Sequence, residues 1–212
     1  MALSPLNLVC FAVKEEAAPF KAAVVSRPDI QILLTGMGQR NADRTTRSAL
    51  SAHKPTLVLT CGFAGALKPD LTLGTVLSSC DDAPHLQSRL LVAGARPARF
   101  HCANRVASTA GEKRELWESS HADAVEMESQ IISNICREHQ IPCATVRVIL
   151  DTASEDLPLD FNFLMTADQQ MDYRKLAFSL AKSPSKIAAL LRLQKQSKAA
   201  AQKLAEVILK VI

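Results

Sequence analysis

The sequence predicts a single α/β domain in which helices flank a central mixed β-sheet. Short apolar, β-branched runs alternate along the chain with longer segments that have apolar residues at helical spacing. Glycine-rich turns follow two of the apolar runs, as is common at strand ends in mainly parallel or mixed sheets. The 212 residues suffice for one core of this kind and are too few for two comfortable domains.

The predicted elements alternate in the order expected of such a fold. Strands are predicted at residues 6–12, 30–35, 56–61, 74–79, 89–93, 105–110 and 143–150. Helices are predicted at 15–25, 39–53 and 124–139, and from 161 onward with a break at Ser183-Pro184. The segment 81–104 has the least regular pattern, because Pro84, Gly94 and Pro97 interrupt its short apolar pieces.

The composition excludes several classes of function. Aromatic residues make up only 4% of the chain, so stacking platforms for nucleic acid are not expected. The six cysteines form no CxxC pair and the histidines show no ligand spacing, which predicts reduced, buried thiols and no metal site. The N-terminus lacks the basic region of a signal peptide, and no apolar run approaches the roughly 20 residues that span a bilayer. We therefore expect a cytoplasmic protein.

The net charge of +4 has its main source near the C-terminus. Residues 182–212 carry seven lysines or arginines against one acidic residue, Glu206. We interpret 185–212 as a basic helical extension of the single domain 1–212, with a solvated face in which the charges are interleaved with alanine and glutamine. A weak contact with phosphate or an anionic membrane surface is the alternative.

Two carboxylates flank a methionine at the start of the helix predicted at 124–139. The positive end of a helix dipole stabilises carboxylates such as Glu126 and Glu128. A carboxylate can also accept hydrogen bonds from both hydroxyls of a ribose diol. A solvated acidic first turn is the simpler interpretation of the same residues.

A lone carboxylate follows the apolar strand at 143–150. This position presents Asp151 at the sheet edge where α/β proteins bind ligands, and partial withdrawal from water suits a carboxyl group to general-acid catalysis. The alternative is a cap or turn aspartate before Thr152. Arg147, in the middle of the strand, needs either a structural ion-pair partner or an anionic ligand.

Acidic residues and glycines follow the ends of other predicted strands. Glu15 and Glu16 come after the first strand, where an acidic helix start is the simpler interpretation. Gly36-Met37-Gly38 and Gly62-Phe63-Ala64-Gly65 allow a ligand to approach the backbone closely. Neither segment matches GxGxxG or the P-loop, and the chain has no GxSxG elbow.

Together these segments resemble the purine nucleoside phosphorylases and nucleosidases, and among them the 5′-methylthioadenosine/S-adenosylhomocysteine nucleosidases. The resemblance runs in order from about residue 6 to residue 180. Val125-Glu126-Met127-Glu128 matches the ribose-binding V-E-M-E motif, and residues 147–151 resemble R-A-I-S-D, whose aspartate protonates the purine. The other similar segments are 12–16, which resembles the acidic motif after the first strand, 35–38, which resembles S-G-I-G, and 60–67, which resembles T-G-S-A-G-G-L.

The resemblance implies a homo-oligomeric enzyme that needs no cofactor and hydrolyses the N-glycosidic bond of an adenine nucleoside. It implies that Asp151 protonates the purine at N7 and that Glu16, helped by Arg147, activates the attacking water. The residues implied to bind the substrate are Glu128 on the ribose hydroxyls, Met127 under the sugar, and Glu126, Phe63, Gly62 and Ala64 around them.

The departures from the family pattern leave three alternatives. The phosphorylases' G-D-P-x-R loop is absent, so a phosphorylase would need other donors, such as Arg40, Arg44 or Arg47. The C-terminal segment resembles a hopanoid-associated subgroup that acts on adenosylhopane. A non-catalytic nucleoside-binding protein would follow if Phe63, in place of a serine, and a shortened 81–104 segment closed the pocket. The 5′ substituent of the substrate is not specified by the sequence.

Overall fold

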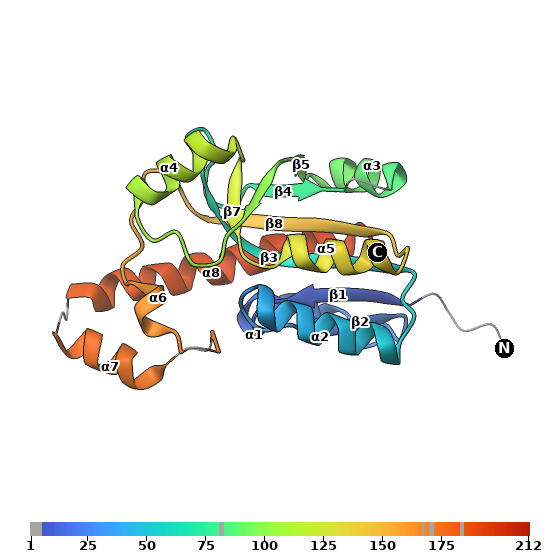
Figure 1. The fold of residues 1–212 in the computed structure, drawn as a ribbon, viewed down its shortest axis with the longest axis horizontal. Helices are drawn as coiled ribbons and strands as arrows, with labels where there is room; N and C mark the ends of the chain where they lie inside the picture. The colour runs from blue at the N-terminus through green and yellow to red at the C-terminus, as the bar shows by residue number, and fades with distance from the viewer. Residues whose placement is uncertain (1–5, 81–82, 167, 170–171, 183–184) are drawn as a thin grey trace.

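A twisted mixed sheet forms the centre of the computed structural model, which describes residues 6–80, 83–166, 168–169, 172–182 and 185–212 (Figure 1). Its strands are β1 (Asn7–Phe11), β2 (Ile30–Leu34), β3 (Leu57–Ala66), β4 (Val76–Ser79), β5 (Arg96–Pro97), β6 (Phe100–Cys102), β7 (Ala124–Glu126) and β8 (Cys143–Asp151). The helices are α1 (Lys14–Ala23), α2 (Gln39–Ala52), α3 (Pro84–Ala93), α4 (Ala110–Ser120), α5 (Ser129–Glu138), α6 (Phe161–Leu164), α7 (Tyr173–Lys182) and α8 (Ser185–Leu209).

The strand order is β2-β1-β3-β8-β4-β5, with β7 paired to the end of β3 and β6 paired to β7. β2, β1, β3 and β8 run parallel, whereas β4 is antiparallel to β8 and β7 is antiparallel to β3. Parallel strands are covered on both faces, which explains why their sequences are nearly continuous apolar runs. The predicted single-domain α/β fold with a mixed sheet is confirmed.

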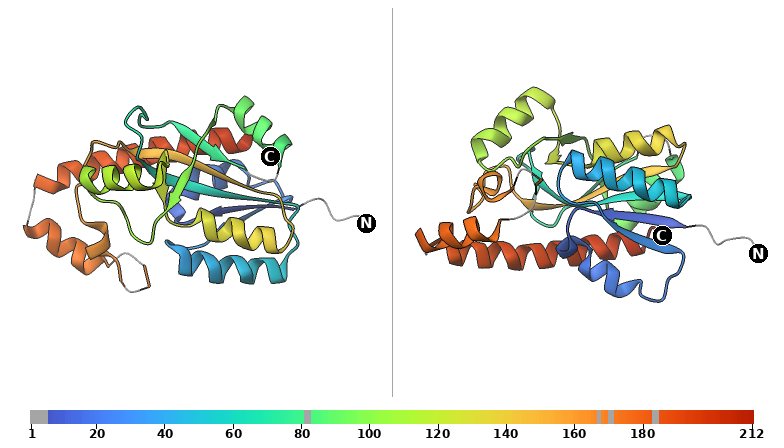
Figure 2. Two further views of the ribbon diagram at one scale, coloured as in Figure 1. Left: turned by 45° about the horizontal axis from the view of Figure 1, so that its top comes forward. Right: turned by 60° about the horizontal axis from the view of Figure 1, so that its bottom comes forward.

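Helices cover both faces of the sheet (Figure 2). One face packs on α1, α3 and the second half of α8, and the other packs on α2 and α5. In α8, Ala201, Leu204 and Ile208 are buried at helical spacing, so the segment predicted as a basic extension contributes to the core. α7 and the first half of α8 lie beyond the end of the sheet, where Leu191 is exposed (Figure 1). The predicted break at Ser183-Pro184 lies outside the described residues.

Several predicted elements are wrong in type or extent. Residues 89–93 belong to helix α3, not to a strand, and 105–110 form no strand before helix α4. The helix predicted at 124–139 begins only at Ser129, because 124–126 are strand β7. The strand predicted at 56–61 continues to Ala66, with a bulge between Ala64 and Gly65.

The two helices that were not predicted, α3 and α4, have local sequence signals at their ends. Pro84 occupies the first turn of α3, and Gly94 follows its last residue in the left-handed conformation with φ of 100°. Thr109 and Glu112 form a reciprocal capping box at the start of α4.

None of the helices in the described part of the chain combines the length and apolar character that a membrane span requires.

Candidate active site

The predicted site residues gather at the edge of the sheet where the parallel strands end. β1, β3 and β8 run in one direction, so their carboxyl ends share this edge. Glu16 lies in α1, directly after β1, and Asp151 is the last residue of β8. β7 pairs with the end of β3 and brings Glu126 to the same region. Side chains from separate parts of the sequence therefore meet in one place.

A buried arginine lies at the centre of this group. Arg147 is 1% exposed, and its Nη2 donates to Glu126 Oε2 at 2.7 Å and to Thr60 Oγ1 at 3.2 Å. The same nitrogen lies 3.8 Å from Glu128 Oε2. Burial works against the charge, but the two glutamates hold the pKa of Arg147 above its ordinary value. Of the two roles left open by the sequence, the structure shows the internal ion pair.

Both oxygens of Glu126 are engaged within the protein. Besides the ion pair with Arg147, Oε2 accepts hydrogen bonds from the backbone N–H groups of Glu128 at 3.0 Å and Ser129 at 2.7 Å. Oε1 accepts one from the Ser129 hydroxyl at 2.8 Å. Burial opposes ionisation, yet Arg147 and these hydrogen bonds keep the pKa of Glu126 below its ordinary value. Glu126 thus fixes the turn that begins α5.

Glu128 has a carboxylate with fewer internal partners. Its Oε1 accepts a hydrogen bond from the Gly38 N–H at 2.7 Å, and Arg147 lies near its Oε2. Burial raises the pKa of Glu128 from 4.5 to about 7; Arg147 opposes this rise and the charge of Glu126 adds to it. The carboxyl group therefore exchanges its proton near neutral pH.

The raised pKa of Glu128 predicts a pH-dependent stability. A folded-state pKa above the unfolded one stabilises the fold below about pH 4.5, and this contribution is lost as pH rises through about 7. At about 1.4 kcal/mol per pH unit, the loss is about 3 kcal/mol. Urea unfolding at about pH 5 and about pH 8 should show a difference in unfolding free energy that Glu128→Gln reduces by this order. An equal pH dependence in both proteins would contradict a buried, titrating carboxyl group.

Glu16 is held by three backbone donors. Its Oε2 accepts from the N–H groups of Ala12 at 3.0 Å and Val13 at 3.2 Å, and its Oε1 accepts from the Phe63 N–H at 2.8 Å. Burial raises the pKa of Glu16, while the Phe63 hydrogen bond and Arg147 work against the rise. The carboxylate is thereby fixed between the ends of β1 and β3 and is made more basic than an exposed glutamate.

Gly62 makes room for the Glu16 carboxylate. A Cβ atom at position 62 would lie 2.7 Å from Glu16 Oε1, closer than a van der Waals contact. Gly62→Ala should therefore lower the unfolding free energy by about 1–3 kcal/mol and displace Glu16. Gly111→Ala is the matched control, because its nearest neighbouring atom lies at 3.8 Å in an exposed helical turn. Equal thermal stability of the two variants would contradict the close approach.

The other predicted pocket residues surround these carboxylates. Ala64 is buried in β3, and Phe63 is half-buried with its ring against the core that α1 and α8 cover. Met127 is half-buried at the turn between β7 and α5. Phe63 contributes its backbone N–H to Glu16, a contact that does not depend on the side chain at this position.

Asp151 is paired with a lysine that sequence reasoning missed. Its Oδ2 forms an ion pair with Lys113 Nζ at 2.5 Å. Burial raises the pKa of Asp151, and the lysine works against this rise. Lys113 belongs to α4, and the capping box at Thr109 was the signal that could have revealed this helix.

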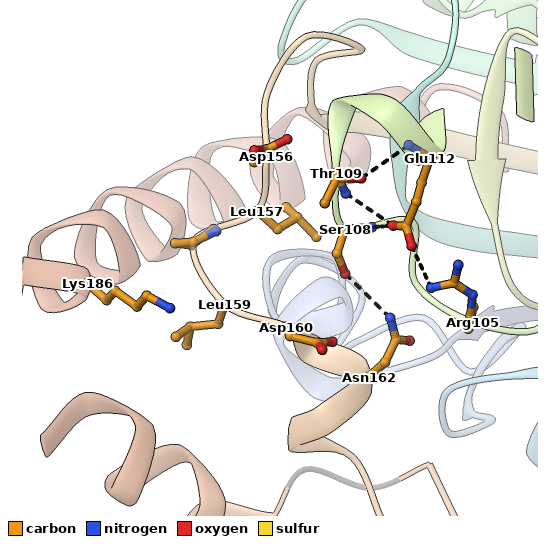
Figure 3. Close-up of a pocket in the computed structure, with 11 residues that line it drawn as sticks. Arg105, Ser108, Thr109, Glu112, Asp156, Leu157, Leu159, Asp160, Asn162 and Lys186 are labelled. Carbon is orange, nitrogen blue, oxygen red and sulfur yellow. Dashed lines mark hydrogen bonds and ion pairs between the residues drawn. The ribbon is translucent and has the colours of Figure 1, made fainter. Parts of the chain in front are cut away.

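Two cavities border helix α4, which carries Lys113. The first, of about 340 Å³, is bordered by the start of α4, by residues 156–160 and by Lys186 of α8 (Figure 3). The second, of about 510 Å³, lies between β6 and α4. Arg105 and Glu112 border both cavities and form an ion pair at 2.7 Å. None of the nine predicted site residues lines either cavity.

The fold and this group of charges define an α/β protein with a carboxylate-rich site at the carboxyl edge of its sheet. The chain belongs to the phosphorylase superfamily, whose family model matches residues 10–100 and 78–192. Among the described residues, no group of three or more His, Cys, Asp or Glu is arranged to hold a metal ion.

The relatives of known structure or name include nucleosidases. The chain is 26% identical over 172 residues to a 5′-methylthioadenosine/S-adenosylhomocysteine nucleosidase of Glaesserella parasuis, which covers 65% of this chain and 74% of that protein. Its fold is similar to a nucleosidase of the same name from Colwellia psychrerythraea in complex with adenine, with a TM-score of 0.73 at 14% identity, over 99% and 95% of the two chains. Futalosine hydrolase of Helicobacter pylori gives 0.68 at 17% identity, over 97% of both chains.

Proposed function

We propose that this protein hydrolyses the N-glycosidic bond of an adenine nucleoside and releases adenine. One observation carries the proposal: three buried carboxylates, Glu16, Glu126 and Glu128, surround Arg147 at the sheet edge that ends in Asp151. The name of the Glaesserella parasuis relative and the adenine complex of the Colwellia psychrerythraea structure support a nucleosidase with this base.

Asp151 is the proposed general acid. Cleavage of the glycosidic bond leaves negative charge on the purine, and a proton delivered to N7 neutralises it. A buried carboxyl group with a raised pKa suits this role, because it holds its proton at higher pH than an exposed aspartate. General-acid catalysis of this kind contributes about 10²- to 10⁴-fold.

Glu128 is the proposed ribose ligand. Its Oε2 has only the distant contact to Arg147 and is thus the carboxylate oxygen best placed to accept hydrogen bonds from sugar hydroxyls. As the ribose gains oxocarbenium character, the negative charge of Glu128 stabilises it more strongly than in the ground state. Glu126 acts through its neighbours in this proposal, by fixing Arg147 and the turn that carries Glu128 and Met127.

Glu16 is the proposed base for the attacking water. Its backbone partners fix the carboxylate at the end of β1, and burial raises its basicity. Met127 and Phe63 would form walls of the sugar pocket, with Gly62 and Ala64 beside them. Arg147 balances the charge of the glutamates.

Water is favoured over phosphate as the nucleophile. The three arginines considered as phosphate donors, Arg40, Arg44 and Arg47, are all exposed on α2. Arg47 is engaged with Asp43 at 3.0 Å and Glu138 at 2.7 Å. These contacts hold Arg47 on the outer face of α2.

Adenine release from 5′-methylthioadenosine, S-adenosylhomocysteine and adenosine, each with and without phosphate, tests the proposal. Release that does not depend on phosphate is the expected result, and the order of the substrates reports the size of the 5′ pocket. Release only with phosphate would assign the protein to the phosphorylases. Tight adenine binding without turnover would favour a non-catalytic binder, and selective turnover of adenosylhopane would favour the lipid-linked substrate.

We also propose a homo-oligomeric assembly and a cytoplasmic location. Exposed apolar side chains of α7 and α8, Phe178, Ile187 and Leu191, support a homo-oligomer, which light scattering would detect as a mass above 23.0 kDa. In the described part of the chain no disulfide joins any of the cysteines, which supports a reducing, cytoplasmic location. Flotation with anionic vesicles would test a weak membrane contact of the C-terminal helix.

A further inference from the structure

Lys113 is a lysine with no exposed side-chain surface, and it lies directly behind the proposed general acid. Its Nζ donates to the carbonyl oxygens of Thr152 and Glu155, both at 2.7 Å, and forms the 2.5 Å ion pair with Asp151. An ammonium group has three protons to donate. Two carbonyl oxygens and the Asp151 carboxylate surround the ammonium group and compensate for its removal from water.

Lys113 is the cation paired with Asp151, and the other neighbours of Asp151 considered next are uncharged or acidic. β3 and β7 face the aspartate with Gly65 and Val125, which carry no charge. Glu155 also acts electrostatically on Asp151, and its Oε2 accepts hydrogen bonds from the Thr152 N–H at 3.0 Å and hydroxyl at 2.9 Å. Arg192 of α8 acts electrostatically on Glu155.

The ion pair with Lys113 affects whether Asp151 carries the proton that a general acid must give. An aspartate beside an ammonium group is favoured as the anion, and an anionic carboxylate has no proton to give. The proton that reaches the base must then come from the ammonium group of Lys113 by way of the Asp151 carboxylate. Without the lysine, burial raises the pKa of the Asp151 carboxyl group further, so that it is protonated near neutral pH. A carboxyl group alone nevertheless loses its proton at lower pH than an ammonium group does.

We propose that Lys113 is a positioning residue that holds the proton which Asp151 passes to the leaving base. The inference rests on the proposed nucleoside hydrolysis. As the C1′–N9 bond breaks, its electron pair moves onto the base, Asp151 transfers a proton to N7, and Lys113 Nζ supplies a proton to Asp151. Water adds its hydroxyl to C1′ and gives its proton to Glu16. When the products leave, Glu16 releases this proton to solvent and solvent returns one proton to the Lys113–Asp151 pair.

The first test compares two leaving groups in Lys113→Met. With adenine as the leaving group, kcat should fall about 10- to 100-fold near pH 8 and much less near pH 6, because the alkaline limb moves to lower pH. With a 4-nitrophenyl riboside, whose leaving group needs no proton, kcat should change less than about twofold. Arg114→Met removes an exposed cation from the same helix and should behave like the wild type. Equal losses for both substrates at every pH would reduce Lys113 to a structural role and overturn the proposal.

Lys113→Arg is the second test, because it keeps a cation that can reach Asp151 but does not release a proton at these pH values. We expect a folded protein that loses adenine release and retains 4-nitrophenyl riboside cleavage. Wild-type kcat for both substrates in Lys113→Arg would overturn the proton-holding role.

A measurement without turnover separates this inference from the proposed function. The ¹³C carboxyl resonance of Asp151, assigned by its absence in Asp151→Asn, reports its ionisation directly. Asp151 should be ionised near neutral pH in the wild type and become protonated there in Lys113→Met. If wild-type protein releases no adenine but shows this titration, the nucleosidase proposal fails and the pairing stands. Unchanged titration in Lys113→Met would overturn the inference.

Discussion

Asp151→Asn is expected to lower kcat for adenine release by about 10²- to 10⁴-fold. Asparagine has the shape of aspartate but cannot protonate N7, so the purine must leave as an anion. Its amide oxygen still accepts a hydrogen bond from Lys113, whose carbonyl partners at Thr152 and Glu155 remain. The fold and nucleoside binding should therefore persist. Steady-state kinetics, calorimetric nucleoside binding and thermal unfolding test these three points.

A surface aspartate provides the control for this experiment. Asp70 pairs with Lys68 at 3.5 Å with both side chains largely exposed, so Asp70→Asn should leave kcat and stability unchanged. An Asp151→Asn enzyme with wild-type kcat would exclude Asp151 as the proton donor. Loss of the fold in Asp151→Asn would instead show that the buried ion pair with Lys113 is needed for stability.

The parts of the fold that the sequence predicted are those in which local pattern and tertiary environment agree. β1 is an apolar run and β8 an apolar run rich in β-branched residues, because both faces of the parallel sheet are buried. β7 was predicted as helix because 124–126 is too short to show a strand period. Pairing with β3 and β6 holds it as a strand, and both partners are distant in the sequence.

The residues of the candidate site also differ in whether the sequence alone could reveal them. The positions of Asp151 and Glu16 at strand ends could be predicted because β8 and β1 are clear from sequence, whereas a role for Glu16 followed only from the family resemblance. Lys113 could not be predicted, because its burial depends on Thr152 and Glu155, about forty residues away. The two roles of Arg147 were equally compatible with the sequence, since its partner Glu126 lies on the strand that was predicted as a helix.

Arg147→Met is expected to be the most destabilising substitution in the site. It removes the buried cation and leaves Glu126 without its ion-pair partner in a region from which water is excluded. Breaking a buried pair in this way costs about 3–5 kcal/mol of unfolding free energy, because an uncompensated charge remains. Urea denaturation near neutral pH measures the loss. A second series at lower pH should show a smaller loss, since the glutamates then take up protons and no longer need the cation.

Arg47→Met is the matched control, because Arg47 also forms a 2.7 Å ion pair, with Glu138, but both side chains are about half exposed. Its expected cost is about 0–1 kcal/mol. The double variant Arg147→Met with Glu126→Gln separates the two causes of instability. If the lone charge of Glu126 dominates, the second substitution restores part of the stability that the first removes, and the two changes are not additive. Additive losses would mean that Arg147 stabilises the site through its packing and its contact to Thr60 instead.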